Sequence, residues 1–256
     1  MGYASRIGVA GLTLGAALGL SAAAATADDV TLPQTLVWTA YDIGSTGYSQ
    51  AVGIGAAFKN RLNVSLRVLP GKNDVSRLVP LRDNRAGYSA TGSESSYASE
   101  AMYLFGTREW GPQPITQLIM SVSDGTSAMV TTRDSGIETI ADLKGRRVAW
   151  VKGAASLQNS IRGHLAFGGL TWNDVVMVEV PGYAASVQAA IDGQADAAYG
   201  TTNSAPFLRI DASPRGLRFL PPQESAAFQR SGMKLRREAL EKNDLPVIQE
   251  AWDVTG

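Results

Sequence analysis

The sequence predicts an α/β fold built as two lobes. Three observations lead to this prediction. Segments of strand-like and helix-like patterning alternate along the chain, the alternation starts again near residue 140, and polar turns rich in glycine follow several of the strands. Alternation of this kind is typical of largely parallel sheets covered by helices. A chain of 256 residues is long enough for two such lobes of about 100 residues each.

The first strand–helix–strand unit begins at the β-rich stretch Thr35–Ala40, which runs into a turn punctuated by glycine. A helix is predicted next because apolar residues recur at three- and four-residue spacing, at Ala51, Ile54, Phe58 and Leu62. Asn63–Leu69 alternates apolar and polar residues as a strand does, and Pro70-Gly71 ends it.

The rest of the first half continues the alternation. We expect a helix over Asp74–Arg82, a short strand over Ala86–Thr91, a helix over Ser93–Phe105, and β-rich runs over Ile115–Val122 and Ala128–Thr132. The alternation predicts a largely parallel sheet in this lobe.

The second half repeats the pattern. A short helical segment over 140–145 leads into a strand over Arg147–Val151, and a helix carrying Leu157, Ile161 and Leu165 on one face follows. The remaining predictions are a strand over Val175–Val180, a helix over Ala184–Asp192, and strands over Ala195–Tyr199 and Leu217–Leu220. We therefore predict lobe 1 over residues 28–128, lobe 2 over 129–222, and a polar, helix-prone C-terminal segment over 223–256.

The N-terminus has the pattern of a cleaved secretory signal peptide over residues 1–27. Arg6 precedes the apolar run Ile7–Leu20, and Ala25-Thr26-Ala27 forms a small-residue cleavage site. The alternative is a membrane anchor, but an apolar run of about 14 residues is short against the roughly 20 needed to span a bilayer. We expect export, and a periplasmic location for the mature protein.

Composition narrows the function classes. Lys plus Arg and Asp plus Glu are balanced at 23 each, and neither sign forms a long block, so we expect no nucleic-acid partner. Cysteine is absent from the sequence, which excludes disulfides, thiol catalysis, Cys-ligated zinc and the lipid-bearing cysteine of a lipoprotein. A small solute or another protein is the expected partner.

The first candidate ligand-binding loop lies between the first strand and the helix that follows it. Its residues are Gly44, Ser45, Thr46, Gly47 and Tyr48. Backbone N–H groups and hydroxyls would converge there at the positive end of a helix, which suits a carboxylate or phosphate. The structural alternative is that glycine and serine cap many strand-to-helix turns whatever the function.

A second loop repeats this placement in the other lobe. Its residues are Lys152, Gly153, Ala154, Ala155 and Ser156. Ser156 could cap the next helix and Lys152 could add a positive charge to an anion site. Two further polar loops end strands, one with Ser93 and Glu94 and one with Thr201 and Thr202. In open parallel sheets, ligands bind outside the carboxyl ends of the strands, where these loops lie.

The sequence contains no positive sign of catalysis. His164 is the only histidine; it lies in the helix after Ser156, next to the apolar face, and we expect a surface or boundary residue rather than a base. No G-x-S-x-G motif is present, and no residue pattern matches a zinc site. Asp42, Glu94 and the other carboxylates show no spacing that would mark two of them as an acid–base pair. Tyr41, Tyr48, Tyr88 and Tyr199 could form the walls of a pocket, although ordinary packing explains them equally well. We predict no catalytic residue, cofactor or metal.

Several segments together resemble the TAXI-type solute-binding receptors of tripartite ATP-independent periplasmic (TRAP) transporters. The resemblance runs over roughly residues 35–222 and rests on order and context, at Ile43–Tyr48, Asp142–Val148, Gly168–Val175 and Asp192–Ala198. The second and fourth of these segments also occur broadly in two-lobed periplasmic binding proteins. The chain departs from the family pattern at Gly47-Tyr48 and at Lys152–Ser156.

The resemblance implies a two-lobed periplasmic binding protein, type II-like, with a ligand cleft between the lobes. Carried over by position, it places ligand contacts in the four loops already named. It also implies that residues 223–256 are a shortened form of the segment that returns to lobe 1 in the family. It also implies that a small anionic or zwitterionic solute, an amino acid or organic acid, is delivered to the integral-membrane subunits of a TRAP transporter. A sensory receptor in the same compartment, or an enzyme on the same scaffold, is the alternative.

Overall fold

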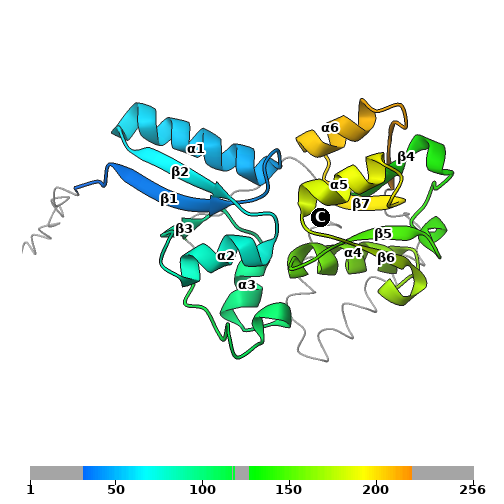
Figure 1. Cartoon of the computed structure of the whole chain (residues 1–256), viewed down its shortest axis with the longest axis horizontal. Coiled ribbons are helices and arrows are strands. Elements are labelled where there is room, and N and C mark those ends of the chain that lie inside the picture. Colours follow the sequence, from blue (N-terminus) through cyan, green and yellow to red (C-terminus); the bar gives the residue numbers. More distant parts are fainter. Residues whose placement is uncertain (1–30, 117, 119–126, 221–256) are drawn as a thin grey trace, which may run out of the picture. The chain divides into compact units, whose positions relative to one another are not determined.

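The computed structural model describes residues 31–116, 118 and 127–220, and these residues contain two β-sheets with helices packed on them (Figure 1). We call the first sheet with helices α1 to α3 lobe 1, and the second sheet with helices α4 to α6 lobe 2. The predicted α/β class is confirmed. The predicted signal peptide over 1–27 and the C-terminal segment over 223–256 lie outside the described residues, as does most of the expected strand over 115–122.

Lobe 1 holds a three-stranded sheet whose strands are parallel, in agreement with the largely parallel sheet predicted for this half. β1 (Thr35–Ala40) lies in the centre and pairs with β2 (Ser65–Pro70) and β3 (Tyr88–Ser89). Its helices are α1 (Thr46–Leu62), α2 (Asp74–Arg82) and α3 (Glu94–Ser99). The β1–α1–β2 crossover is why the two strands run parallel, and it carries both chain segments to the same edge of the sheet.

Local capping explains where α1 and α2 begin. The Oγ of Ser45 accepts a hydrogen bond from the Tyr48 N–H at 3.2 Å and starts α1, while Asn63 ends it with a left-handed φ of 54°. Asn73 and Ser76 form a reciprocal capping box at the start of α2. These caps fix the positions of the turns that precede each helix.

The prediction of one helix over Ser93–Phe105 is wrong. The structure has α3 ending at Ser99 and a separate 3₁₀ turn at Tyr103–Phe105. Ala101, which lies between them, and Tyr103, the first residue of the turn, adopt positive φ angles of 52° and 50°. Positive φ breaks a right-handed helix, and no glycine or proline marks the position in the sequence.

Lobe 2 holds a five-stranded sheet in the order β6-β5-β7-β4-β8. The strands are β4 (Ser127–Thr132), β5 (Arg147–Val151), β6 (Val176–Val180), β7 (Ala197–Thr201) and β8 (Leu217–Leu220). β5 runs parallel to β6 and β7, whereas β4 pairs antiparallel with β7 and β8, so this sheet is mixed. Because β4 pairs within this sheet from Ser127 onward, lobe 2 takes in residues 127 and 128, which the domain prediction had assigned to lobe 1.

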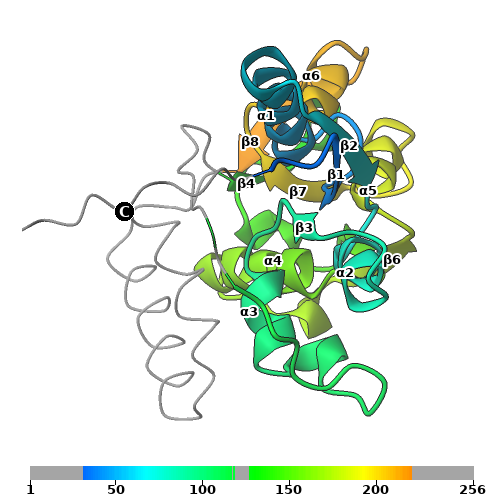
Figure 2. The same cartoon turned by 90° about the vertical axis from the view of Figure 1, so that its left-hand side faces the viewer.

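The helices of lobe 2 cover both faces of its sheet (Figures 1 and 2). α4 (Ala155–Phe167) packs through Ile161 and Leu165 on the face that carries Met129 and Val148. α5 (Tyr183–Ile191) and α6 (Ala205–Asp211) pack on the opposite face, against Val130 and Ala198. Neighbouring residues of a strand point to opposite faces, so both sets of core contacts come from the same strands.

α6 was not expected from the sequence. Pro206 stands in its first turn, which is a favourable helix position for proline, and Ser204 precedes it as the N-cap. Within the part of the chain that is described, none of the helices is long and apolar enough to cross a bilayer.

Candidate functional site

A cavity of about 330 Å³ lies between the two lobes and is lined by both of them. Tyr41, Lys72 and Gly92 come from the segments that follow β1, β2 and β3, so the cavity lies at the carboxyl edge of the first sheet. Its lining is rich in hydroxyl groups; lobe 2 alone contributes Ser127, Ser156, Ser160, Tyr183, Tyr199, Thr201 and Ser204. The size and polarity suit a small polar solute.

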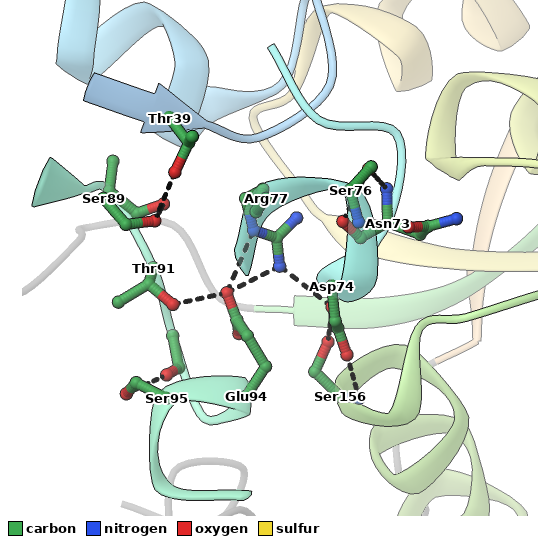
Figure 3. A network of polar contacts seen from close by, with 12 residues as sticks. Thr39, Asn73, Asp74, Ser76, Arg77, Ser89, Thr91, Glu94, Ser95 and Ser156 are labelled. Atoms are coloured by element: carbon green, nitrogen blue, oxygen red, sulfur yellow. Dashed lines mark hydrogen bonds and ion pairs between the residues drawn. The ribbon is translucent and has the colours of Figure 1, made fainter. Parts of the chain in front are cut away.

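A buried ion network forms the lobe 1 wall of this cavity (Figure 3). The Nε and Nη2 of Arg77 donate hydrogen bonds to Oε1 of Glu94 at 3.0 and 2.6 Å, and Nη2 also donates to Oδ1 of Asp74 at 2.9 Å. The Thr91 hydroxyl donates to the same Glu94 oxygen at 2.6 Å. The Tyr41 ring lies 4.1 Å from the guanidinium carbon. Three charged side chains are thus held in fixed positions, each almost completely buried.

The two carboxyls of this network differ in their proton affinity. Burial and the nearby charge of Glu94 raise the pKa of Asp74 from its ordinary value to about 6, although Arg77 and Ser156 act in the opposite direction. Burial also acts on Glu94, but the charge of Arg77 and the hydrogen bond from Thr91 outweigh it, so the pKa of Glu94 is lowered. The pair therefore takes up its first proton at Asp74.

A pH dependence of stability follows from Asp74. Because its pKa is raised in the folded state, the folded protein binds this proton more tightly than the unfolded chain does, and its contribution to stability grows as pH falls through about 6. We expect the difference in Tm between wild type and Asp74→Asn to shift in favour of wild type as pH falls from about 7.5 to about 5. Thermal unfolding of both proteins across that range measures it, and a constant difference would contradict the assignment.

Carboxylates of lobe 1 also reach the helices of lobe 2. Oδ2 of Asp74 accepts a hydrogen bond from the Ser156 N–H at 2.8 Å, and its Oδ1 accepts one from the Ser156 Oγ at 2.8 Å, both at the start of α4. Oδ2 of Asp42 accepts from the Ala184 N–H at 3.0 Å, at the start of α5. Each carboxylate therefore lies where a helix exposes unpaired N–H groups.

Backbone and amide contacts join the lobes at the same place. The Asn73 side-chain amide donates to the Lys152 carbonyl at 3.0 Å, and the Val75 N–H donates to the Gly153 carbonyl at 3.3 Å. The Thr46 hydroxyl donates to Oδ1 of Asn203 at 3.2 Å on another side of the cavity. The described structure is thus closed around the cavity by hydrogen bonds of the protein itself.

The structure brings half of the predicted ligand-binding residues together at this cavity. The predicted residues that line it are Ser45, Thr46, Gly47, Ser93, Glu94, Ser156 and Thr201. Those that do not line it are Gly44, Tyr48, Lys152, Gly153, Ala154, Ala155 and Thr202. Glu94 and Ser156 both face partners within the protein, so their presence at the wall does not leave them free for a solute.

Lys152 lies outside the site that the sequence suggested for it. Its side chain is 73% exposed, and its ammonium group forms an ion pair with Glu179 at 3.0 Å. Strand pairing explains the position, because Lys152 directly follows β5 and Glu179 lies in the neighbouring strand β6. The positive charges that do line the cavity are Lys72 and Arg77.

Sequence reasoning missed Lys72, Asp74 and Arg77 as site residues. Asp74 and Arg77 carry a recognisable signal, since opposite charges three residues apart in a predicted helix lie on one face. The sequence does not show that these two side chains are buried, because their burial depends on contacts with Glu94 and Ser156, which are far away in the chain.

His164 is fully buried, whereas the sequence predicts a surface or boundary residue. It is 1% exposed, its Nδ1 lies 2.9 Å from the Ser160 carbonyl, and its ring packs edge-on against Tyr199 at 4.9 Å. Burial lowers its pKa, which keeps the imidazole neutral. Among the described residues, no group of three metal-ligating side chains is placed to hold a metal ion.

Comparison with protein-family models matches residues 90–243 to the family described as NMT1/THI5 like. This match spans more than half of the 256 residues. The chain belongs to the NMT1/THI5-like family. Among curated protein sequences none matches it.

Solved structures share the fold of this NMT1/THI5-like protein. An amino acid ABC transporter substrate-binding protein, AbpA from Streptococcus pneumoniae, bound to L-arginine, matches with a TM-score of 0.51 and 13% identity over 86% of this chain and 95% of its own. The alkanesulfonate-binding protein SsuA from Xanthomonas axonopodis pv. citri, bound to MOPS, matches with a TM-score of 0.51 and 18% identity, over 88% of this chain and 81% of its own.

A truncated arginine-bound ArgBP from T. maritima gives a TM-score of 0.51 at 14% identity, over 80% of this chain and 96% of its own. The two-lobed solute-binding-protein fold predicted from the sequence is confirmed. The TAXI type of receptor is not what the family comparison matches.

Proposed function

We propose that this protein is a solute-binding receptor that takes up a small carboxylate-bearing solute, an amino acid or organic acid, in the cavity between its lobes. The observation that carries the proposal is the cavity itself, which receives polar side chains from both lobes. A solute that contacts both lobes stabilises the closed form by the free energy of those contacts. The proposal is supported by a solved structure of the same fold, an amino acid ABC transporter substrate-binding protein bound to L-arginine.

The groups left without partners favour a negatively charged part of the solute. The Nη1 of Arg77 has no hydrogen-bond partner among the described residues, and the Lys72 ammonium has none there either. Thr46 and Gly47 line the cavity at the start of α1, where helix N–H groups are exposed. By contrast, the carboxylates of Asp42, Asp74 and Glu94 already accept hydrogen bonds from the protein.

Isothermal titration of the purified protein tests the proposal. The panel contains amino acids, organic acids and, because a neighbour of the same fold is an alkanesulfonate-binding protein, alkanesulfonates. We expect saturable binding of at least one carboxylate. A folded protein that binds no compound of the panel would count against the function, and binding of sulfonates alone would replace the carboxylate.

Two lysines provide a matched pair for locating the anionic group. Lys72→Ala is expected to weaken binding of the carboxylate by about 1 to 3 kcal/mol, the scale of a hydrogen bond to a charged group. Lys152→Ala is expected to leave the affinity unchanged, because Lys152 pairs with Glu179 and does not line the cavity. Titration of both variants with the same solute gives the two affinities. A larger loss for Lys152→Ala than for Lys72→Ala would show that Lys152, and not Lys72, binds the anionic group.

We also propose that the receptor works in the periplasm, after removal of residues 1–27, and delivers its solute to a membrane transporter. The TRAP-type partner expected from the sequence remains a proposal. An ABC-type partner is the second candidate, because AbpA is an amino acid ABC transporter substrate-binding protein.

The two transporter types use different energy sources: an ion gradient for the TRAP type and ATP for the ABC type. Membrane vesicles from the source organism, supplied with the purified receptor and labelled solute, separate them. Uptake that follows an ion gradient without ATP supports the TRAP-type partner. Uptake that requires ATP at the cytoplasmic face of the membrane supports the ABC-type partner. N-terminal sequencing of the exported protein checks cleavage after Ala27.

A further inference from the structure

The start of α4 at the cavity is already occupied by an anion of the protein. Helix α4 has 13 residues, its N-cap Ala154 offers no capping side chain, and the Ser156 N–H is available in the first turn. The Asp74 carboxylate fills this place, with one oxygen 2.8 Å from the Ser156 nitrogen and the other 2.8 Å from its hydroxyl (Figure 3). We call this place the α4 anion position.

A helix start that faces a ligand cavity is a position at which an anionic group of a ligand can be held by N–H groups and the helix dipole. The sequence suggested such an anion at Ser156, and the structure supplies it from lobe 1. A carboxylate of a solute cannot use the same donors while Asp74 holds them.

Asp74 is held in place from behind. Arg77 donates to its Oδ1 at 2.9 Å, and Arg77 is itself bound by Glu94, whose Oε1 also accepts from Thr91. Asp74 is 1% exposed and Arg77 is 4% exposed. A carboxylate fixed in this way costs little further side-chain entropy when it accepts the Ser156 hydrogen bonds.

We propose that Asp74 determines the specificity of the solute site by filling the α4 anion position. A second anionic group of a solute would meet the negative charge of Asp74 there and would be repelled. The single anionic group of the solute is directed instead to lobe 1, where Lys72, the Nη1 of Arg77 and the start of α1 offer donors. This last step rests on the proposed function; the occupancy of the α4 anion position by Asp74 does not.

The first test vacates the position and refills it with formate. Asp74→Ala removes the carboxylate and leaves space next to Arg77 and Ser156, so formate should bind between them. We expect the Tm of Asp74→Ala to rise by about 3 to 5 °C for each tenfold increase in formate above its Kd. The Tm of wild type and of the control Asp211→Ala, whose side chain is 53% exposed, should not rise in this way.

Chloride at the same ionic strength is the control that separates formate binding from general screening. In the double variant with Asp74→Ala and Ser156→Ala, the rise in Tm with formate should be smaller, because the hydroxyl donor is lost. If Asp74→Ala is unfolded in buffer, formate is expected to restore its far-ultraviolet circular dichroism. Failure of formate to stabilise or refold Asp74→Ala beyond chloride would overturn the occupancy of the position.

The second test addresses specificity. Asp74→Asn keeps the size of the side chain and removes its charge, so the ratio of dicarboxylate to monocarboxylate affinity should rise at least about tenfold relative to wild type. An unchanged ratio would overturn the specificity role. The two proposals fail separately: absence of any solute binding in wild type removes the proposed function, whereas the formate test requires no solute.

Discussion

Replacing Arg77 with methionine is expected to lower the free energy of unfolding by about 3 to 5 kcal/mol. Arg77 is 4% exposed and is the partner of two carboxylates that are each 1% exposed. Methionine fills a similar volume but leaves Asp74 and Glu94 close together without a compensating charge. One or both would have to take up a proton or draw in water, and either costs free energy.

Arg85→Met is the matched control for this measurement. Arg85 also makes an ion pair, with Asp83 at 3.3 Å, but its side chain is 62% exposed. Its loss is expected to change stability by less than about 0.5 kcal/mol. Urea unfolding of both variants gives the two values, and equal effects would show that the buried network of Arg77 contributes no more than a surface pair.

Replacing Gly47 with alanine is expected to weaken solute binding about 10- to 100-fold, or about 1.4 to 2.8 kcal/mol. A Cβ atom at position 47 would overlap the ring of Tyr41. That ring lines the cavity and stacks on Arg77 at 4.1 Å, so it cannot move without disturbing the wall. Gly47 itself lines the cavity at the start of α1.

Gly53→Ala in the same helix provides the comparison. A Cβ at position 53 meets no described atom within 4 Å, and alanine is a better helix former than glycine. We expect Gly53→Ala to leave the affinity unchanged and to raise the stability slightly. Titration of both variants with a solute that binds wild type measures the contrast; a similar affinity for the two would mean that Tyr41 adjusts freely.

Local patterns in the sequence were sufficient for most of the fold. The apolar spacing of α4, the alternation of β2 and the serine-containing turn at Ser45 all act within a few residues, so the sequence shows them directly. The failure at Ala101 and Tyr103 has the opposite cause, since their positive φ angles carry no glycine or proline signal.

The loops of the site were predicted only in part, for a related reason. Ser45, Thr46 and Gly47 are at the cavity because a strand-to-helix turn places them at the sheet edge. The orientation of each side chain within a loop depends on what lies across from it. Lys152 meets Glu179 of the adjacent strand and turns away from the cavity.

Periodicity and turn chemistry are local, so they are enough to predict the α/β class, the order of most elements and the edge of the sheet where polar loops gather. Which charges meet depends instead on contacts between distant parts of the chain. Asp74 and Ser156 are far apart in the chain, yet they form the contact at the start of α4. Such a pairing depends on how the two lobes close, and burial then changes the proton affinity of the carboxyl that makes it.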